Sequence, residues 1–401
     1  MDVGKYQEKS MTIKDVVITS YVRTPFTRAK KGGLKDTRPD TMAAEVIREA
    51  VARSKGLDPA EIEDVAIGCA MPEAEQGMNV ARIASVMAGL PDTVPAITVN
   101  PFCSSGVQTI SQMAERIMLG AIDVAVAGGT ESMTMIPMGG NKTSANPQIM
   151  DEYPEIYTPM GTTAENVAQK FDVTRQQQDE FAYKSHQKAV EAWERNFFDG
   201  EVMALDTEII KDGKRQSITV DRDDNPRPDT SMEVLSKLPT SFKQNGGTVT
   251  PGNASPLTDG AAATVVMSAD KADELGIDPM GYYRGYQVAG VAPEIMGIGP
   301  VPAIRKLLDH HGMSVDDIDL FEINEAFASQ SVYCQRELGI DDDKLNVNGG
   351  AIAIGHPLGV SGTRMAGTIL RALEEADGQF GVVSMCVGGG MGAAALFERV
   401  G

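Results

Sequence analysis

Two residues stand in sequence contexts that suit nucleophilic catalysis. Cys103 lies in the segment NPFCSSG, between an apolar stretch and a run of small and apolar residues that predicts a helix. A helix N-terminus carries partial positive charge and unpaired N–H groups, which stabilise a thiolate. His356 lies in GGAIAIGHPLGVSG, whose five glycines predict a tight loop with exposed backbone. A neutral imidazole there could take the proton of the Cys103 thiol, as nucleophilic catalysis by Cys requires. Each motif alone also fits a purely structural role.

Two further motifs add polar groups. Cys386 ends an apolar stretch and precedes VGGGMGAA, which fits G-x-G-x-x-[G/A]. A dinucleotide site needs a helix after this motif, but the few remaining residues predict a final strand. Glycines such as Gly388 would instead expose backbone N–H groups to a developing oxyanion. Asn324, in INEAFA, either caps the following helix, which the local pattern favours, or holds a water or carbonyl through its amide.

Composition narrows the function classes. The 401 residues are 42% hydrophobic and 23% charged, which is typical of globular proteins. With 36 Lys+Arg against 56 Asp+Glu, the net charge of −20 argues against nucleic acid or an anionic membrane surface as a partner. An anionic small substrate would need a local basic patch.

Cysteine and histidine content gives further expectations. Four cysteines are too few for a disulfide framework, and together with four histidines they show no metal-ligand spacing, so we expect no catalytic metal. The sequence has no secretory signal and no apolar run of membrane-spanning length. We therefore expect a cytoplasmic protein without a membrane span.

Alternating strand and helix patterns predict an α/β fold. The predicted N-terminal strands are 15–21, 64–69, 96–100 and 123–127, and the predicted helices are 41–55, 79–89 and 104–119. The C-terminal third repeats this order, with strands at 319–323, 345–348 and 381–386, a helix from about 361 and a final strand after 393. The parallel of TVN…C…AVAGG with NVN…H…MCVGGG suggests two related halves packed face to face.

The middle of the chain differs from both ends. Residues 133–253 are richer in Met, Pro, Asn, Gln and charge, with one long predicted helix at 175–196 and a polar, loop-like segment at 211–229. Loops on a rigid scaffold are where proteins grip substrates, so we predict a substrate-binding insertion; a merely solubilising insertion is the alternative.

Five motifs together resemble the thiolase family. They are NPFCSSG, GNASPLTDGAAA, NEAFA, NVNGGAIAIGHPLGVSG and CVGGGMG, in the order and at the separations of that family and spread over nearly the whole chain. Within the family, the chain looks most similar to the degradative 3-ketoacyl-CoA thiolases of bacteria.

The resemblance implies a fold and its boundaries. The expected thiolase fold has two similar βαβαβαββ halves in a five-layer αβαβα sandwich with a loop-domain insertion. The implied N-terminal half is 1–131 and 259–275, the CoA-gripping loop domain is 132–258, and the C-terminal half is 276–401.

The implied activity is acyl transfer in fatty-acid β-oxidation, with CoA and acyl-CoA as substrates and no cofactor. Cys103 would attack a 3-ketoacyl-CoA after His356 takes its proton, and Cys386 would protonate the departing acetyl-CoA carbanion. A second CoA would then remove the acyl group from Cys103. His356 and a water held by Asn324 would form one oxyanion hole, and the backbone N–H groups of Cys103 and Gly388 the other.

The resemblance also assigns binding residues. Six positions match contacts to CoA or the acyl channel: Arg227, Ser255, Met160, Phe242, Met296 and Phe327. Three prolines depart from the family pattern. Pro101 stands two residues before the nucleophile, and Pro256 replaces a common Gly beside Ser255. Pro159 stands where acetoacetyl-CoA thiolases usually have His, which favours a roomier acyl channel.

Other classes compete with this interpretation. One alternative is an acetoacetyl-CoA thiolase working in Claisen condensation. Others are a decarboxylating ketoacyl synthase, a cysteine protease and a non-catalytic CoA- or lipid-binding module. The family forms homodimers or homotetramers, and degradative members can join a hydroxyacyl-CoA dehydrogenase/hydratase partner, so both kinds of assembly are expectations here.

Overall fold

The structure is a computed structural model that describes residues 13–401. Its N-terminal half alternates strands and helices before ending in two long strands. The elements are β1 (Val16–Arg23), α1 (Pro39–Arg53), β3 (Asp64–Gly68), α2 (Val80–Met87), β4 (Ala96–Val99), α3 (Ser105–Met118), β5 (Val124–Ser132) and β8 (Thr258–Ser268). The short strand β2 (Thr27–Arg28) pairs with β8, and α8 (Ala269–Leu275) leads into the second half.

The C-terminal half repeats this order. Its elements are β9 (Gly281–Gly290), α9 (Pro300–His311), β10 (Leu320–Ile323), α10 (Ala328–Leu338), α11 (Ala351–Ile354), α12 (Ser361–Ala376), β11 (Phe380–Val387) and β12 (Met391–Arg399). The remaining elements lie between β5 and β8: α4 (Pro147–Glu152), α5 (Met160–Lys170), α6 (Arg175–Glu194), β6 (Leu205–Lys211), β7 (Lys214–Val220) and α7 (Met232–Ser236).

The two halves meet at the centre of one hydrogen-bonded sheet. The strand order is β10-β11-β12-β9-β1-β8-β5-β3-β4, with β9 and β1 joining the halves in an antiparallel pair. Counted outward from that pair, the spatial order is the same in both halves. The first strand of the half is followed by its last strand, then by its penultimate strand and then by its second strand. The predicted relation between the halves is therefore confirmed. Besides packing on each other, the two halves are joined by hydrogen bonds between β1 and β9.

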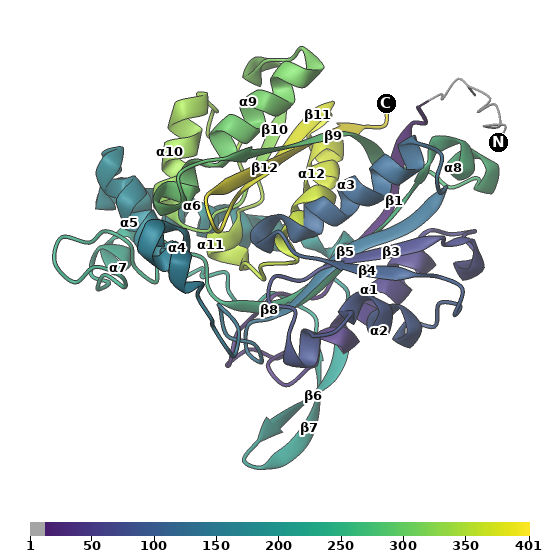
Figure 1. Ribbon diagram of the computed structural model, residues 1–401, viewed down its shortest axis with the longest axis horizontal. Coiled ribbons are helices and arrows are strands. Elements are labelled where there is room, and N and C mark those ends of the chain that lie inside the picture. The colour runs from purple at the N-terminus through teal and green to yellow at the C-terminus, as the bar shows by residue number, and fades with distance from the viewer. Residues whose placement is uncertain (1–12) are drawn as a thin grey trace.

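Helices complete the five layers of the predicted sandwich. Helices α1 and α2 cover the outer face of the N-terminal strands, and α9 packs on the outer face of the C-terminal strands beside α10. Helices α3 and α12 contact each other and the strands of both halves (Figure 1). Apolar residues at helical spacing, such as Ile110, Met113 and Ile117 in α3 and Ile369 and Leu373 in α12, bury this middle layer.

The prediction of a strand at 345–348 was wrong. Leu345 makes only an isolated bridge to Phe321, and Asn346 then turns away with a φ of 45°. The Asn346 side chain replaces the missing ladder, because its Oδ1 accepts from the Ile323 N–H at 2.9 Å and its Nδ2 donates to the Ile323 carbonyl at 2.9 Å. An apolar pattern cannot show that a side-chain amide will stand in for backbone.

The loop predicted at 211–229 was also partly wrong, because β7 occupies its first part and pairs with β6. The hairpin turns at Asp212 and Gly213, both with positive φ, as a tight two-residue turn requires. Most of β7 is exposed, so its polar composition hid the strand. In Figure 1 the tip of this hairpin projects away from the body of the molecule.

Candidate active site

Cys103 lies in a tight helical turn, Phe102–Ser104, between β4 and α3. Phe102 has a φ of 46°, a conformation that is costly for a bulky residue and often found at functional sites. The side chain of Asn100 holds it by accepting from the Phe102 N–H at 2.9 Å. The turn places Cys103 where only 1% of its surface is exposed, yet it lines a cavity of about 590 Å³.

Two glycines explain why Cys103 and His356 line one cavity. The N-terminal ends of α3 and α12 touch at Gly106 and Gly362. A Cβ on Gly362 would lie 2.3 Å from the Val107 backbone nitrogen, and one on Gly106 would lie 2.7 Å from the Thr363 nitrogen. Only glycine permits so close an approach. The loops that precede these helices carry the two reactive residues to the same place.

We assign the tautomer of His356 from its neighbours. Ser361 Oγ lies 3.2 Å from the Pro357 carbonyl and 2.6 Å from His356 Nδ1; with the hydroxyl donating to that carbonyl, Nδ1–H donates to Ser361 Oγ. Nε2 then carries the free lone pair and accepts from Asn324 Nδ2 at 3.2 Å. Burial, aided by the nearby Arg364 charge, lowers the pKa of His356 to about 3. The imidazole is therefore neutral and able to accept a proton at Nε2.

Asn324 does not cap a helix, so the locally favoured interpretation was wrong. Its neighbour helix α10 begins later, at Ala328, and the Asn324 amide instead bonds His356. Asn324 Oδ1 is buried and has no hydrogen-bond partner. A buried acceptor without a donor is costly, so this oxygen suits a bound water or substrate hydrogen.

Gly388 lies beside the nucleophile at the β11–β12 turn. The backbone N–H groups of Gly388 and of Cys103 itself both approach the Cys103 sulfur and favour its charged form. This turn depends on glycine at Gly390, whose φ is 83° and whose Cβ would lie 2.4 Å from the Val291 carbonyl oxygen. Two N–H groups converging near the sulfur suit stabilisation of an oxyanion on a carbon bonded to it.

The two cysteines interact, and both are protonated at rest. Burial, with a smaller contribution from the Glu131 charge, raises the pKa of Cys103 to about 12 and outweighs the two N–H groups. The thiol and imidazole therefore rest as a neutral pair, contrary to the thiolate expected from the helix N-terminus. Burial, followed by the charge of an ionised Cys103, raises the pKa of Cys386 well above its usual value. The strand β11, which carries Cys386, packs against the helical turn that carries Cys103, so the two cysteines lie on adjoining elements.

Cys386 and its neighbours form the wall behind the cavity. Cys386 packs with the buried Met296 and Ala326 and with Met160 and Phe327. Of the four predicted channel residues, Met160, Phe242 and Phe327 line the cavity, and the Phe242 and Phe327 rings meet edge to face at 6.1 Å. Met296 lies beneath this lining, with 1% of its surface exposed.

The predicted CoA contacts occupy two adjoining spaces. Ser255 lines the large cavity, and its N–H and Oγ both donate to the Ala326 carbonyl, at 3.0 and 3.2 Å. Arg227 lines a second cavity of about 180 Å³ together with His186, whose Nδ1 accepts from the Arg227 N–H at 3.3 Å. Pro256 lines both spaces. Burial, followed by the Arg227 charge, lowers the pKa of His186 to about 4.

The other unusual prolines also contribute to the site. The Pro101 carbonyl accepts from the Ser104 N–H at 3.2 Å and so closes the nucleophile turn. Pro159 lines the large cavity immediately before α5.

Several supporting residues escaped sequence reasoning. Glu131, buried at the end of β5, accepts from the N–H groups of Ala70 at 2.8 Å, Met71 at 3.3 Å and Gly359 at 2.9 Å. Ala70 packs in the same small cluster as Cys103, so Glu131 ties the histidine loop to the wall of the nucleophile. Burial raises the pKa of Glu131. The sequence held one sign of this role, because Glu131 is a carboxylate near the end of VAVAGGTES, a strand of mostly small residues.

Glu325 does the same on the other side of His356. It accepts from Ser185 Oγ of α6 at 2.6 Å, from Asn346 Nδ2 at 2.8 Å and from the Ile352 N–H at 3.1 Å. The carboxylate thus joins the insertion to the segment leading to His356. That segment is not only loop, because residues 351–354 form the helical turn α11 before Gly355, which has a φ of 116°.

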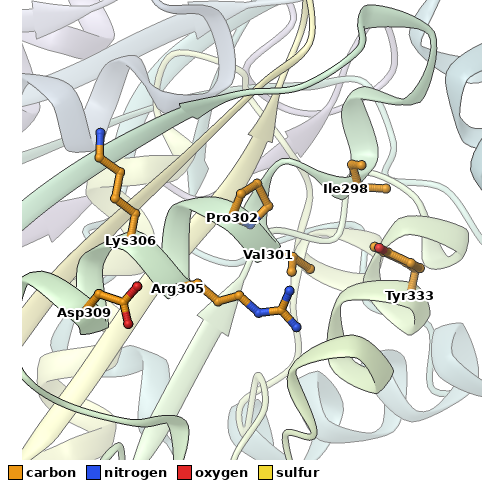
Figure 2. Close-up of a pocket in the computed structure, with 7 residues that line it drawn as sticks. All are labelled: Ile298, Val301, Pro302, Arg305, Lys306, Asp309 and Tyr333. Carbon is orange, nitrogen blue, oxygen red and sulfur yellow. The ribbon is translucent and has the colours of Figure 1, made fainter.

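A comparable hollow lies elsewhere on the surface. Figure 2 shows this space of about 510 Å³, which is lined by Ile298, Val301, Pro302, Arg305, Lys306, Asp309 and Tyr333. It contains none of the predicted site residues. Within residues 13–401, no three His, Cys, Asp or Glu side chains gather as metal ligands, and no helix of that part is long and apolar enough to cross a membrane.

Comparison with known proteins agrees with this geometry. The family model of the thiolase N-terminal domain matches residues 16–270, and that of the thiolase C-terminal domain matches residues 277–399. The chain therefore belongs to the thiolase family, whose implied fold is confirmed.

Individual relatives show which members of the thiolase family the chain is similar to. The chain is 50% identical to a Bacillus subtilis protein named 3-ketoacyl-CoA thiolase, over 96% of this chain and 100% of the relative. It is 45% identical to peroxisomal 3-ketoacyl-CoA thiolase A of Mus musculus, over 96% and 91%.

Solved structures agree in fold. A Bacillus anthracis acetyl-CoA acetyltransferase matches with a TM-score of 0.89 at 39% identity, over 98% of this chain and 100% of that one. The dimeric peroxisomal thiolase of Saccharomyces cerevisiae matches with a TM-score of 0.88 at 40% identity, over 96% and 98%.

Proposed function

We propose that this protein is an acetyl-CoA C-acyltransferase that cleaves 3-ketoacyl-CoA with CoA, giving acetyl-CoA and a shortened acyl-CoA in fatty-acid β-oxidation. The observation that carries the proposal is the buried arrangement around Cys103. Cys103 lines the cavity with His356, whose unprotonated Nε2 accepts from Asn324, and its sulfur meets the N–H of Gly388. The names of the relatives support the choice of substrate.

The first half-reaction transfers the acyl group to the enzyme. The Asn324 amide releases its hydrogen bond to His356 Nε2, which takes the proton of the Cys103 thiol while the sulfur attacks the keto carbon. The carbon–carbon bond to the acetyl-CoA unit then breaks, its electron pair forms an enolate, and Cys386 supplies the proton that completes acetyl-CoA. A protonated His356 and the free Oδ1 side of Asn324, through a water, face the enolate oxygen.

The second half-reaction releases the product. An incoming CoA thiol gives its proton to the Cys386 thiolate and attacks the acyl-enzyme carbonyl. The N–H groups of Cys103 and Gly388 hold the thioester oxygen as it becomes negative. Cys103 leaves as a thiolate and recovers its proton from His356, which restores the neutral pair.

A neutral resting pair suits this sequence of proton transfers. With the pKa of Cys103 raised to about 12 and that of His356 lowered to about 3, the proton moves only as the carbonyl begins to share the negative charge. Stabilisation that appears only in the transition state raises kcat instead of merely tightening substrate binding.

An acetoacetyl-CoA thiolase working in condensation is the second candidate, because an acetyl-CoA acetyltransferase is among the structural matches. Pro159 in the cavity wall supports the degradative activity, since it fills less space than the histidine expected in condensing enzymes. A thiolysis series from acetoacetyl-CoA to long 3-ketoacyl-CoA tests this choice. Faster turnover beyond four carbons supports the proposal, and activity with acetoacetyl-CoA alone contradicts it.

Mass spectrometry tests the two sulfurs separately. Cys103→Ala should form no acyl-enzyme and lose about 10³-fold or more of turnover. Cys386→Ala should still be acylated by simple acyl-CoA but should lose thiolysis. An acyl adduct that persists in Cys103→Ala would overturn the assignment of the nucleophile. No CoA-dependent cleavage by the unaltered protein would leave only binding or decarboxylation.

The assembly and location remain predictions. We propose a homodimer or homotetramer, with the dimeric yeast relative as support for a dimer. Light scattering with size-exclusion chromatography measures this, and a monomer contradicts it. A hydroxyacyl-CoA dehydrogenase/hydratase partner has no support beyond the family resemblance. A cytoplasmic location fits the bacterial relative, whereas the mouse relative is peroxisomal by name, and cell fractionation decides.

A further inference from the structure

A run of cations stands at the mouth of the large cavity. Arg28, Lys30 and Lys31 line that cavity, and all three are exposed. Lys35 and Arg38, which follow closely in the chain, each pair with a carboxylate. Within residues 13–401, no acidic side chain lies within ion-pair distance of the first three. In a protein with a net charge of −20, these three cations form a local basic stretch beside the cavity, which would attract an anionic ligand.

The backbone of this segment is held rigidly. Lys30 has a φ of 66°, and its N–H donates to Thr134 Oγ1 at 2.6 Å. Thr134 in turn donates through its N–H to the buried carboxylate of Asp259 at 2.9 Å. The Ala29 N–H donates to the Leu257 carbonyl at 2.9 Å. The backbone of Lys30 is therefore fixed to the end of the central sheet, and its flexible side chain starts from a defined point beside the cavity.

The segment also connects the two cavities that hold the predicted CoA contacts. Arg28 lines both the 590 Å³ cavity, which reaches Cys103, and the 180 Å³ cavity, which contains Arg227. Asp224 lies near Arg28 and accepts from its N–H at 2.8 Å, so part of the Arg28 charge is offset. Among the described residues, no carboxylate forms an ion pair with Lys30 or Lys31, so these two supply positive charge at this point.

CoA has a chemistry that fits this arrangement. Its thiol end is a neutral, flexible arm, and its nucleotide end carries several phosphate charges. An arm that reaches Cys103 through the apolar cavity leaves the phosphates at the mouth. Ammonium groups bind phosphate as point charges, without the fixed geometry that a guanidinium imposes.

Resting on the proposed function, we propose that Lys30 and Lys31 bind the phosphate groups of CoA and of acyl-CoA at the cavity mouth. They select substrates by charge and do not take part in the bond-making steps. The residues predicted from the family resemblance lie elsewhere in the two cavities, Arg227 in the smaller and Ser255 in the larger, so the lysines form an additional contact.

Thiolysis kinetics with a series of acceptor thiols test this inference. The variant is Lys30→Gln with Lys31→Gln, which keeps most of each side-chain stem. Its KM for CoA should rise roughly tenfold, with kcat within about twofold, since exposed charge contacts each contribute a few-fold in binding. With pantetheine, which has no phosphate, the variant and the unaltered protein should have equal KM.

Two comparisons make the test specific. Lys211→Gln with Lys214→Gln removes the same charge from the exposed tip of the β6–β7 hairpin and should leave every KM unchanged. The thiol 4′-phosphopantetheine separates a single phosphate, such as a carrier-protein arm would offer, from the full nucleotide. If the lysine variant loses as much with 4′-phosphopantetheine as with CoA, the first phosphate carries the contact, and a loss only with CoA places it on the nucleotide phosphates.

The result that overturns the inference differs from failure of the proposed function. An active enzyme whose lysine variant has an unchanged KM for CoA, or loses equally with pantetheine, refutes the role of the lysines and leaves thiolysis intact. An unaltered protein that cleaves no 3-ketoacyl-CoA with any thiol refutes the proposed function itself.

Discussion

The two halves of the molecule have the same order of elements but treat the segment before their central helix differently. In the N-terminal half, β4 runs directly into the short turn of Cys103 and then into α3. In the C-terminal half the matching strand is missing, and residues 345–360 instead form the helical turn α11 and the loop of His356. The Asn346 side chain takes over the hydrogen bonds of the lost strand.

This difference indicates a division of labour between related halves. The N-terminal half keeps its regular strand, and one strained residue, Phe102, places Cys103, the proposed nucleophile, at a helix end. The C-terminal half lacks the matching strand. The residues in its place hold His356, the proposed base, and the groups that bond to it. The glycine contact between α3 and α12 keeps the two specialised segments together.

The strongest way to break the comparison is to separate the two helices. Gly362→Ala adds a Cβ that would lie 2.3 Å from the Val107 backbone nitrogen, and backbone cannot yield as a side-chain tip can. We expect a loss of about 3 kcal/mol in the free energy of unfolding, together with most of the activity. Urea denaturation and thiolysis assays measure the two effects.

Gly290→Ala is the matched control, because its added Cβ would meet nothing within 4 Å. It should change stability by less than about 1 kcal/mol. Equal stability of Gly362→Ala and the unaltered protein would contradict the proposed role of the helix contact.

The second prediction concerns the buried imidazole. The pKa of His356 is lowered to about 3, so between pH 6.5 and 3 the unfolded chain binds a proton that the folded protein does not. Folded stability must therefore fall as the pH drops through this window, by about 1.4 kcal/mol per unit, or about 2 kcal/mol at pH 5. Urea midpoints of His356→Asn at pH 7 and pH 5 should differ less than those of the unaltered protein.

His186, with a pKa lowered to about 4, contributes to the same slope from outside the catalytic loop. His186→Asn should thus also flatten the pH dependence, but without removing thiolysis chemistry. An unaltered slope in His356→Asn would mean that the imidazole is already exposed to protons in the folded state.

The smallest effect should come from Ser361, which receives the Nδ1–H of His356. Ser361→Ala removes one neutral hydrogen bond, so we expect kcat to fall about fivefold with KM for CoA unchanged. Ser361→Thr keeps the hydroxyl and should recover part of the loss. If Ser361→Ala leaves kcat and its pH profile unaltered, Ser361 is not needed to keep Nε2 unprotonated, and the prediction is wrong.

Sequence patterns predicted the strands and helices of the N-terminal half well, because apolar periodicity and glycine turns report local structure directly. They failed at 345–348 and in the β6–β7 hairpin, where a side-chain amide and an exposed polar strand follow no apolar pattern. The candidate site residues were named from motifs. Glu131 was not, because the hydrogen bond that its carboxylate accepts from the Gly359 N–H joins residues far apart in the chain. Ser361 is close to His356 in the chain, but the motif does not show which hydroxyl faces the imidazole.

The protonated state of Cys103 has a consequence for the durability of the enzyme. Peroxides, disulfides and most electrophiles attack sulfur as the anion and react slowly with the neutral group. Since burial raises the pKa of Cys103, the proposed nucleophile, to about 12, we expect its sulfur to resist oxidation when no substrate is bound. In the proposed mechanism the sulfur loses its proton only when it attacks the substrate carbonyl. The same buried thiol can therefore resist oxidation between turnovers and react rapidly once the substrate is bound.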